Sequence, residues 1–395
     1  MRYNAANFDH PIDRRGTDCE KWDSLCLREA REMLPLWIAD MDFRCPEEIV
    51  NALINRSKHP VYGYTTQTER YTEALLSFIA RRHGIQLEAS QQYTLPCVIT
   101  GLCAAVQALT EPGDKIIIQP PVYGPFYQSI ERNHRIIKEN PLLRDDLNRY
   151  TMDYEGLERI CSEGAKLLIL CSPHNPVGRC WSPHELSKLV SILYRHDVYL
   201  LSDEIHWDFI FPPCAFTSVL ALPEAQSETA PIAVVTSASK TFNLAGLLQA
   251  TLLTRNPVMM KLLTDGMQSA GVTQGNIFSL IATETAYREC DAWLDALLIY
   301  LDQSRQIVQE EVKNRIPKAI LSPIEATYLA WLDVSPYGFS NKELMRRTHA
   351  QGLALTDGTH YGPSAGEGFL RISLPCPHDQ LREALVRLEK SLTRP

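Results

Sequence analysis

Four polar residues with chemically useful side chains each follow a short apolar run of the sequence. Lys240 comes after IAVVTSAS, Asp203 after VYLLS, Asn175 after KLLILCSPH, and Tyr123 after KIIIQPPV. In open α/β sheets, ligands bind beyond the carboxyl ends of the strands, so residues directly after such runs are candidates for a site. A lysine amine in a desolvated pocket has a lowered pKa and can form an imine with an aldehyde. The four residues together predict chemistry on a carbonyl-bearing cofactor.

Pyridoxal 5′-phosphate (PLP) has a use for each of these residue types. Lys240 would form a Schiff base with its aldehyde, and Asp203 would keep its ring nitrogen protonated as an ion pair. Asn175 would donate a hydrogen bond to the ring oxygen, and Tyr123 would stack on the ring face.

The phosphate of such a cofactor needs hydrogen-bond donors. We expect a strand near residues 97–100, followed by a helix that opens with Gly101, Leu102 and Cys103. The backbone N–H groups at a helix start bind phosphate well. We therefore assign the phosphate to these three residues, assisted by the hydroxyl of Ser237.

Arg371 interrupts the apolar run FLRISL. A guanidinium can grip an α-carboxylate through two parallel hydrogen bonds and so fix the orientation of an amino acid. Each residue alone also has an ordinary explanation: a surface lysine, an aspartate that caps a helix, an Asn-Pro turn or an ion-paired arginine. Their joint placement at successive strand ends is what favours a site.

The elements that would position these residues are readable from the hydrophobic pattern. Apolar runs between about 95 and 255 are separated by a dozen or more residues, which is typical of parallel strands buried on both faces. A long helical pattern without proline covers 276–314, and YLAWLDV, FLRISL and two helices, near 341–351 and 377–392, follow it. The prediction is a three-layer, mostly parallel α/β sheet domain with a smaller α+β domain.

A chain of 395 residues exceeds the size of one growing core, so we expect two lobes with a cleft between them. We divide the chain into a large PLP-binding α/β domain, 46–285, and a small α+β domain with an N-terminal arm, 1–45 and 286–395.

Composition excludes several classes of partner. The formal net charge of −8 argues against nucleic acid or an anionic membrane as the main ligand. No run approaches the 20 or so apolar residues that span a bilayer, and the N-terminus has no apolar signal core. We expect a cytoplasmic protein whose 11 scattered cysteines are reduced thiols, with no metal site.

The segments SPHNPVGR, LLSDEIHWDF and SASKTFNLAG resemble the fold-type I, aspartate aminotransferase-like superfamily of PLP enzymes (class I/II). Within it, RRGTDCEKWD, LPLWIADMDF, YGYT, PPVYGPF and DEIHWD resemble the MalY/PatB family of cystathionine β-lyases, or C–S lyases. The resemblance extends from about residue 8 to 390.

The resemblance implies the same roles for Lys240, Asp203, Asn175 and Tyr123, and makes Lys240 the catalytic residue. It implies a homodimer with shared active sites, in which Tyr64, rather than Tyr62, reaches the phosphate of the other subunit. It implies that Arg371 holds the substrate carboxylate. We also expect Tyr123, Asn175 and Ala39 at the substrate. Further candidates for the pocket wall are Trp37 and Asp40.

Two departures from the wider superfamily stand out. An arginine that often lies eight positions after the lysine and binds phosphate is replaced by Leu248, followed by Gln249. Three positions after the aspartate, a frequent tyrosine is replaced by His206, which we place at the cofactor.

The reaction implied is cleavage of the Cβ–S bond of cystathionine or a related cysteine S-conjugate, releasing a thiol such as homocysteine, pyruvate and ammonia. Two alternatives remain at this stage. An aminotransferase would use the same residues with a keto-acid partner. A PLP-binding regulatory protein would act through partner contacts.

Overall fold

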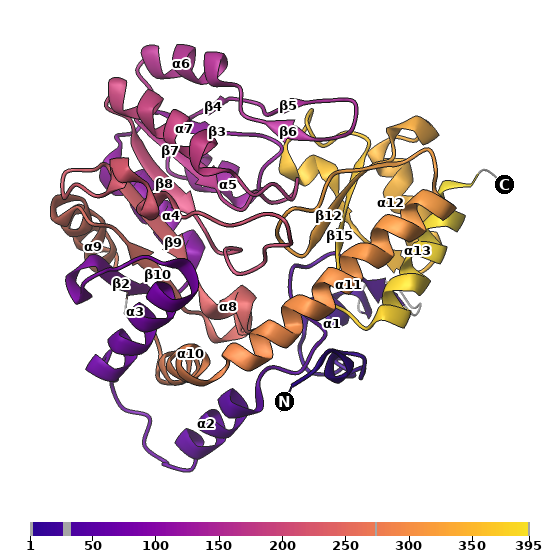
Figure 1. Cartoon of the computed structure of the whole chain (residues 1–395), viewed down its shortest axis with the longest axis horizontal. Helices are drawn as coiled ribbons and strands as arrows, with labels where there is room; N and C mark the ends of the chain where they lie inside the picture. The colour runs from indigo at the N-terminus through magenta and orange to yellow at the C-terminus, as the bar shows by residue number, and fades with distance from the viewer. Residues whose placement is uncertain (1–2, 27–32, 273–274, 394–395) are drawn as a thin grey trace.

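The computed structural model describes residues 3–26, 33–272 and 275–393. Its largest element is a seven-stranded sheet, and Figure 1 shows this sheet with its helices beside a second, smaller lobe. The strand order is β2 (Gln92–Leu95), β10 (Ala250–Leu253), β9 (Ile232–Thr236), β8 (Tyr199–Asp203), β7 (Leu167–Cys171), β3 (Lys115–Ile118) and β4 (Ile136–Glu139).

Five neighbouring strands of this sheet, from β9 to β4, pair in parallel. β10 is antiparallel to both of its neighbours, β9 and β2. β2 therefore points the same way as the parallel strands, while the amino end of β10 lies at their carboxyl edge. The predicted mostly parallel sheet is confirmed.

Successive side chains of a strand point to opposite faces of the sheet, which explains why helices cover both faces of the large sheet. In β3, Ile116 and Ile118 pack in one core cluster and Ile117 in the other. The first cluster is closed by α4 (Val98–Leu109), α5 (Pro125–Glu131) and α9 (Pro257–Ser269). The second contains residues of α3 (Glu69–His83), α6 (Tyr154–Ser162), α7 (Pro183–Arg195) and α10 (Ile277–Glu289). This gives three layers, since a sheet buried on both faces needs helices on both.

The expected strand near 97–100 is wrong. VITG is the first turn of α4, and the strand before it, β2, ends at Leu95. The long pattern over 276–314 forms two helices, α10 and α11 (Asp291–Arg315), which meet at Cys290. α11 then runs toward the smaller lobe (Figure 1).

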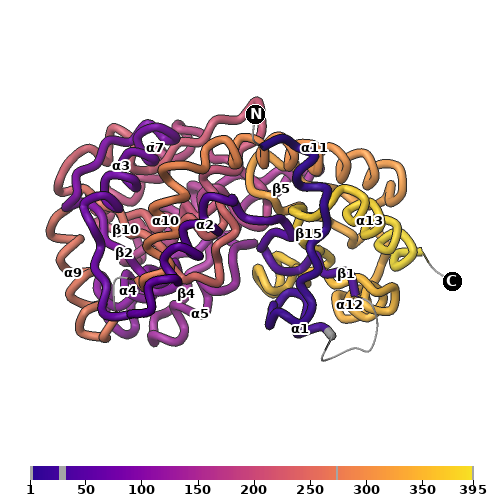
Figure 2. The backbone as a smooth tube through the Cα atoms, turned by 90° about the horizontal axis from the view of Figure 1, so that it is seen from below, coloured from indigo at the N-terminus to yellow at the C-terminus, as the bar shows by residue number. Residues whose placement is uncertain are grey.

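The smaller lobe contains a four-stranded antiparallel sheet, β11 (Ile320–Leu321), β12 (Leu329–Asp333), β15 (Phe369–Ser373) and β14 (Thr356–Asp357). α12 (Asn341–Ala350) and α13 (His378–Leu392) pack beside it, close to the predicted helices. The N-terminal segment, with α1 (Glu20–Cys26), lies over this lobe (Figure 2), where β1 (Leu34–Pro35) pairs with β13 (Leu353–Ala354).

Four further helices and strands lie outside these groups. α2 (Glu47–Ser57) packs on α10, and β5 (Leu143–Arg144) pairs with β6 (Tyr150–Thr151). The short helix α8 (Ala238–Thr241) follows β9 and carries Lys240. Ser237 caps α8 by accepting a hydrogen bond from the backbone N–H of Ser239.

Candidate active site

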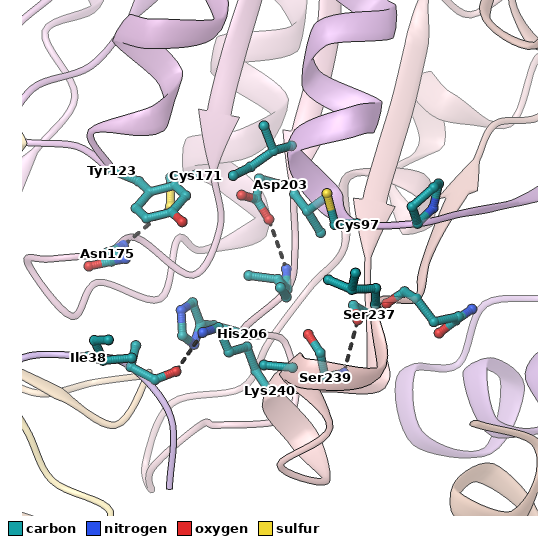
Figure 3. A pocket seen from close by; sticks show the side chains of 18 of the residues that line it. Ile38, Cys97, Tyr123, Cys171, Asn175, Asp203, His206, Ser237, Ser239 and Lys240 are labelled. Atoms are coloured by element: carbon teal, nitrogen blue, oxygen red, sulfur yellow. Dashed lines mark hydrogen bonds between the residues drawn. The ribbon is translucent and has the colours of Figure 1, made fainter. Parts of the chain in front are cut away.

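A cavity of about 360 Å³ lies at the carboxyl edge of the large sheet and reaches the small lobe. Strand ends β7, β8 and β9 contribute Cys171, Asp203 and the Ser237–Lys240 segment, while β15 contributes Arg371 (Figure 3). Nine of the residues expected at the site line this cavity: Lys240, Asp203, Asn175, Tyr123, Ser237, His206, Arg371, Ala39 and Trp37.

The amine of Lys240 points into the cavity, where its Nζ donates a hydrogen bond to the carbonyl oxygen of Ala39 over 2.5 Å (Figure 3). Burial, followed by the nearby guanidinium of Arg371, lowers the pKa of Lys240 to about 8. About one-tenth of the amine is then unprotonated at pH 7, far more than for an exposed lysine. Lys240 is thereby prepared to act as a nucleophile or base.

Asp203 is a buried carboxylate with little compensation from the protein. One of its oxygens, Oδ1, accepts a hydrogen bond from the backbone N–H of Ile205 at 3.1 Å. Burial raises the pKa of Asp203 to about 7, and Lys240 opposes that shift. A cation placed against this carboxylate would stabilise its charged form.

Asn175 and Tyr123 form a wall of the cavity. The backbone N–H of Asn175 donates to the sulfur of Cys171 at 3.3 Å (Figure 3), and no described residue bonds its buried side-chain oxygen. Burial, followed by the charge of Asp203, raises the pKa of Tyr123 to about 12, so its phenol stays protonated. An unpaired buried amide needs a ligand or water to satisfy it.

Arg371 is 5% exposed and lines the cavity from β15. One of its terminal nitrogens donates to the carbonyl oxygen of Trp37 at 2.5 Å and to Thr356 Oγ1 at 3.2 Å. Its buried Nε has no hydrogen-bond partner in the described part of the chain. The guanidinium is thus anchored and still has capacity to bind an anionic group.

The helix start at this cavity differs from the expected one. Because α4 begins at Val98, its first turn contains the residues that line the cavity, with Cys97 before it. Gly101 lies deeper, where an added Cβ would be 2.7 Å from a methyl group of Val235, and Leu102 is fully buried. Gly101, Leu102 and Cys103 do not line the cavity, whereas Val98 and Ile99, the first two residues of α4, do.

Three other residues expected at the site differ in their surroundings: His206, Ser237 and Tyr64. His206 is 3% exposed, and burial lowers its pKa well below the usual value, with Lys240 as the next cause, so the imidazole is neutral. The hydroxyl of Ser237 donates to the carbonyl oxygen of Gln249 at 2.5 Å. Tyr64 does not line the cavity of its own chain, because it lies fully exposed in the segment between α2 and α3.

Comparison with known proteins places this geometry in a family. The model for aminotransferases of class I and II matches residues 31–388. The chain belongs to this family. Cystathionine beta-lyase PatB of Bacillus subtilis is 39% identical over 391 residues, which is 98% of this chain and 100% of that protein.

Two solved structures of similar size share the fold. Cystalysin from Treponema denticola, whose structure contains pyridoxal 5′-phosphate, has a TM-score of 0.93 at 32% identity and covers 98% of each chain. The PLP-bound C–S lyase from Staphylococcus hominis has a TM-score of 0.91 at 29% identity, over 100% of this chain and 99% of that one.

Leu248 and Gln249 also line the cavity of this family member, and β10 explains why. Since β10 is antiparallel to β9, the residues before it lie at the same edge as the residues after β9. Leu248 has a left-handed backbone, with φ of 56°, and 55% of its surface is exposed. Its position eight residues after the lysine was the sequence signal for this contact.

The residues present fit PLP. The cavity holds a lysine amine with a lowered pKa and a buried carboxylate to which no described residue bonds a cation. The first turn of a 12-residue helix lies in the same wall and can accept a phosphate. Tyr361, which lies outside the quoted motifs, also lines the cavity.

Other site types find no support in the described residues. Within 3–26, 33–272 and 275–393, no group of His, Cys, Asp or Glu side chains has the arrangement of a metal site. No described helix combines the length and apolar character needed to cross a bilayer.

Proposed function

We propose that the protein is a PLP-dependent C–S lyase that cleaves cystathionine or a related cysteine S-conjugate to a thiol, pyruvate and ammonia. The observation that carries this function is the buried amine of Lys240, which shares one cavity with Asp203 and Arg371. The full-length similarity to cystathionine beta-lyase PatB supports the lyase reaction.

In this proposal, Lys240 holds PLP, Asp203 faces its ring nitrogen, and Asn175 and Tyr123 contact its ring. The first turn of α4 and Ser237 would hold its phosphate. When bound, PLP stabilises negative charge that develops on the substrate's Cα.

The substrate's α-carboxylate would bind Arg371, whose guanidinium is already oriented by Trp37. That grip fixes the Cα–H bond relative to the amine of Lys240. Once the substrate's amino group has displaced Lys240 from the cofactor, the freed Nζ would accept the Cα proton, because its lowered pKa leaves part of the amine unprotonated near neutral pH. Ala39 and Tyr123 would flank the substrate.

We also propose a homodimer with shared sites. The segment between α2 and α3 exposes three large side chains: Val61 (61%), Tyr62 (57%) and Tyr64 (111%). A second copy would cover them, and its Tyr64 would reach the phosphate. Light scattering of the purified protein tests whether it is a dimer. Tyr64→Phe should weaken PLP binding while light scattering still gives the mass of a dimer.

An aminotransferase is the second candidate, since the family model bears that name. Incubation with cystathionine and no keto acid separates the two functions. A lyase releases pyruvate and a thiol over many turnovers, whereas an aminotransferase stops after one half-reaction. Absence of pyruvate from a panel of cysteine S-conjugates would overturn the lyase proposal.

A further inference from the structure

Residues 39–43, which we call the strap, begin at the cavity wall, where Ala39 lies beside Lys240. The carbonyl oxygen of Ala39, the first strap residue, accepts two hydrogen bonds: 2.5 Å from Lys240 Nζ and 3.1 Å from the hydroxyl of Tyr328. This carbonyl is therefore an acceptor for the amine that the proposed function uses. Its position depends on what holds the strap.

One side of the strap is held by the N-terminal segment. The guanidinium of Arg14 donates two hydrogen bonds to the Asp40 carboxylate, at 2.7 and 3.1 Å. Lys21, which is 1% exposed, donates to the backbone carbonyl of Asp40 at 3.2 Å and to Asp42 at 2.8 Å. A bidentate arginine contact fixes the orientation of the carboxylate as well as its distance from the guanidinium.

The other side of the strap is held by Asn243, which follows the short helix α8 that carries Lys240. Asn243 donates from its side-chain nitrogen to the carbonyl oxygens of Met41 and Phe43, each at 3.0 Å. Its side-chain oxygen accepts from the N–H of Met41 at 3.1 Å. The strap is thus joined to the segment that follows Lys240, and the N-terminal segment holds it at Asp40 and also at Asp42.

We propose that Asp40 is a positioning residue: held by Arg14 and Lys21, it fixes the Ala39 carbonyl against the amine of Lys240. The inference rests on the proposed function, in which that amine carries PLP. Asp40 touches neither the substrate nor the cofactor in this scheme. It acts through the preceding peptide group and through its negative charge.

The charge of Asp40 also favours the cationic form of Lys240. Burial opposes that form, as do Arg371 and Lys21, while Asp203 supports it. Groups that face Lys240 therefore come from several elements: Arg371 on β15, Lys21 on α1, Asp40 in the strap, Asp203 on β8 and the neutral His206 after it.

The test compares three variants of the full-length protein. Asp40→Asn removes the charge with little change in size, and Arg14→Lys keeps the charge but loses the two-pronged contact. Asp13→Asn is the matched control, because it breaks an exposed ion pair with Arg15 in the same segment. The charge-preserving variant Asp40→Glu tests rescue.

Two pH titrations report on Lys240. One follows the visible absorbance of the PLP-loaded protein, and the other follows acetic anhydride labelling of Lys240 in the apoprotein by peptide mass. We expect Asp40→Asn and Arg14→Lys to move both midpoints down by about 0.5–1 pH unit, because the protonated form loses a partner. Asp13→Asn should leave both midpoints unchanged. Asp40→Glu should bring them most of the way back to the wild-type values.

Unchanged midpoints in Arg14→Lys would overturn the inference, even if Asp40→Asn fails to fold. A lower melting temperature with wild-type midpoints would likewise make Asp40 a purely structural residue. Failure of the proposed function looks different. In that case PLP would not attach to Lys240 in the wild-type protein, and the labelling titration of the apoprotein would still measure the effect of the strap.

Discussion

The hydroxyl of Thr241 donates a hydrogen bond to Oδ2 of Asp208 over 2.6 Å, one residue beyond the lysine of the site. The other oxygen of this buried carboxylate lies 3.1 Å from Nε2 of His83, at the end of α3. His83 in turn stacks on Trp207, with ring centroids 4.0 Å apart. The short helix α8 is therefore anchored to the layer of helices behind the sheet.

Thr241→Val should lower the free energy of unfolding by about 1–3 kcal/mol, since a buried carboxylate oxygen loses its donor. Thr241→Ser keeps the hydroxyl, so it should lower the free energy of unfolding by less than Thr241→Val does. Urea unfolding measures both, with Thr229→Val in an exposed loop as the control. Equal stability of Thr241→Val and wild type would show that this bond contributes nothing.

Lys240→Ala should abolish turnover on every substrate of the wild-type enzyme, because the buried amine is the proton acceptor in the proposed mechanism. Borohydride reduction followed by peptide mapping should label Lys240 in the wild-type protein and leave the variant unlabelled. Lys261→Ala, at an exposed lysine in α9, is the control. A label on any other residue would refute the assignment.

Asp203→Asn should stabilise the apoprotein at pH 8. The pKa of Asp203 is raised from 3.8 to about 7, so its contribution is favourable below pH 3.8 and is lost as the pH rises through 7. At pH 8, replacement by Asn should add roughly 2–4 kcal/mol to the free energy of unfolding. Urea unfolding at pH 5 and pH 8 checks this.

The same replacement should weaken PLP binding, because the ring nitrogen loses its anionic partner. Loss of apoprotein stability at pH 8 would contradict the burial of an uncompensated charge. Retained PLP affinity in Asp203→Asn would instead contradict the role of the carboxylate at the ring.

Leu248→Arg should tighten PLP binding about 3- to 10-fold, because it places a cation where related proteins often have one and where this chain has an apolar side chain. Fluorescence titration of the apoprotein measures the affinity. Leu248→Gly is the matched variant: it relieves the left-handed backbone at φ of 56° and should raise stability without tightening PLP binding. Equal affinities for both variants would contradict an electrostatic effect.

The sequence located Lys240, Asp203 and Asn175 because parallel strands end at one edge of a sheet. Each residue follows a run whose length and composition identify a buried strand, and each lines the cavity. Arg371 was found for a different reason, since a charged residue within a buried strand requires a partner.

The start of α4 was missed because VITG is a run of only four residues, three of them β-branched, and so short a run is consistent with either a strand or a helix. Burial in the core, rather than local preference, decides for the helix. The place of Gln249 in the cavity depends on the direction of β10, which no local pattern encodes. The domain limits at 45/46 and 285/286 stay predictions.

The hydrogen bond between Arg371 and Trp37 joins residues 334 positions apart in the chain. During synthesis on the ribosome, the large sheet can acquire all of its strands well before Arg371 has been made, since its last strand ends at Leu253. A nascent chain of that length has the lysine but lacks Arg371, the proposed carboxylate anchor. The proposed grip on the substrate can therefore form only after every strand of the large sheet has been synthesised.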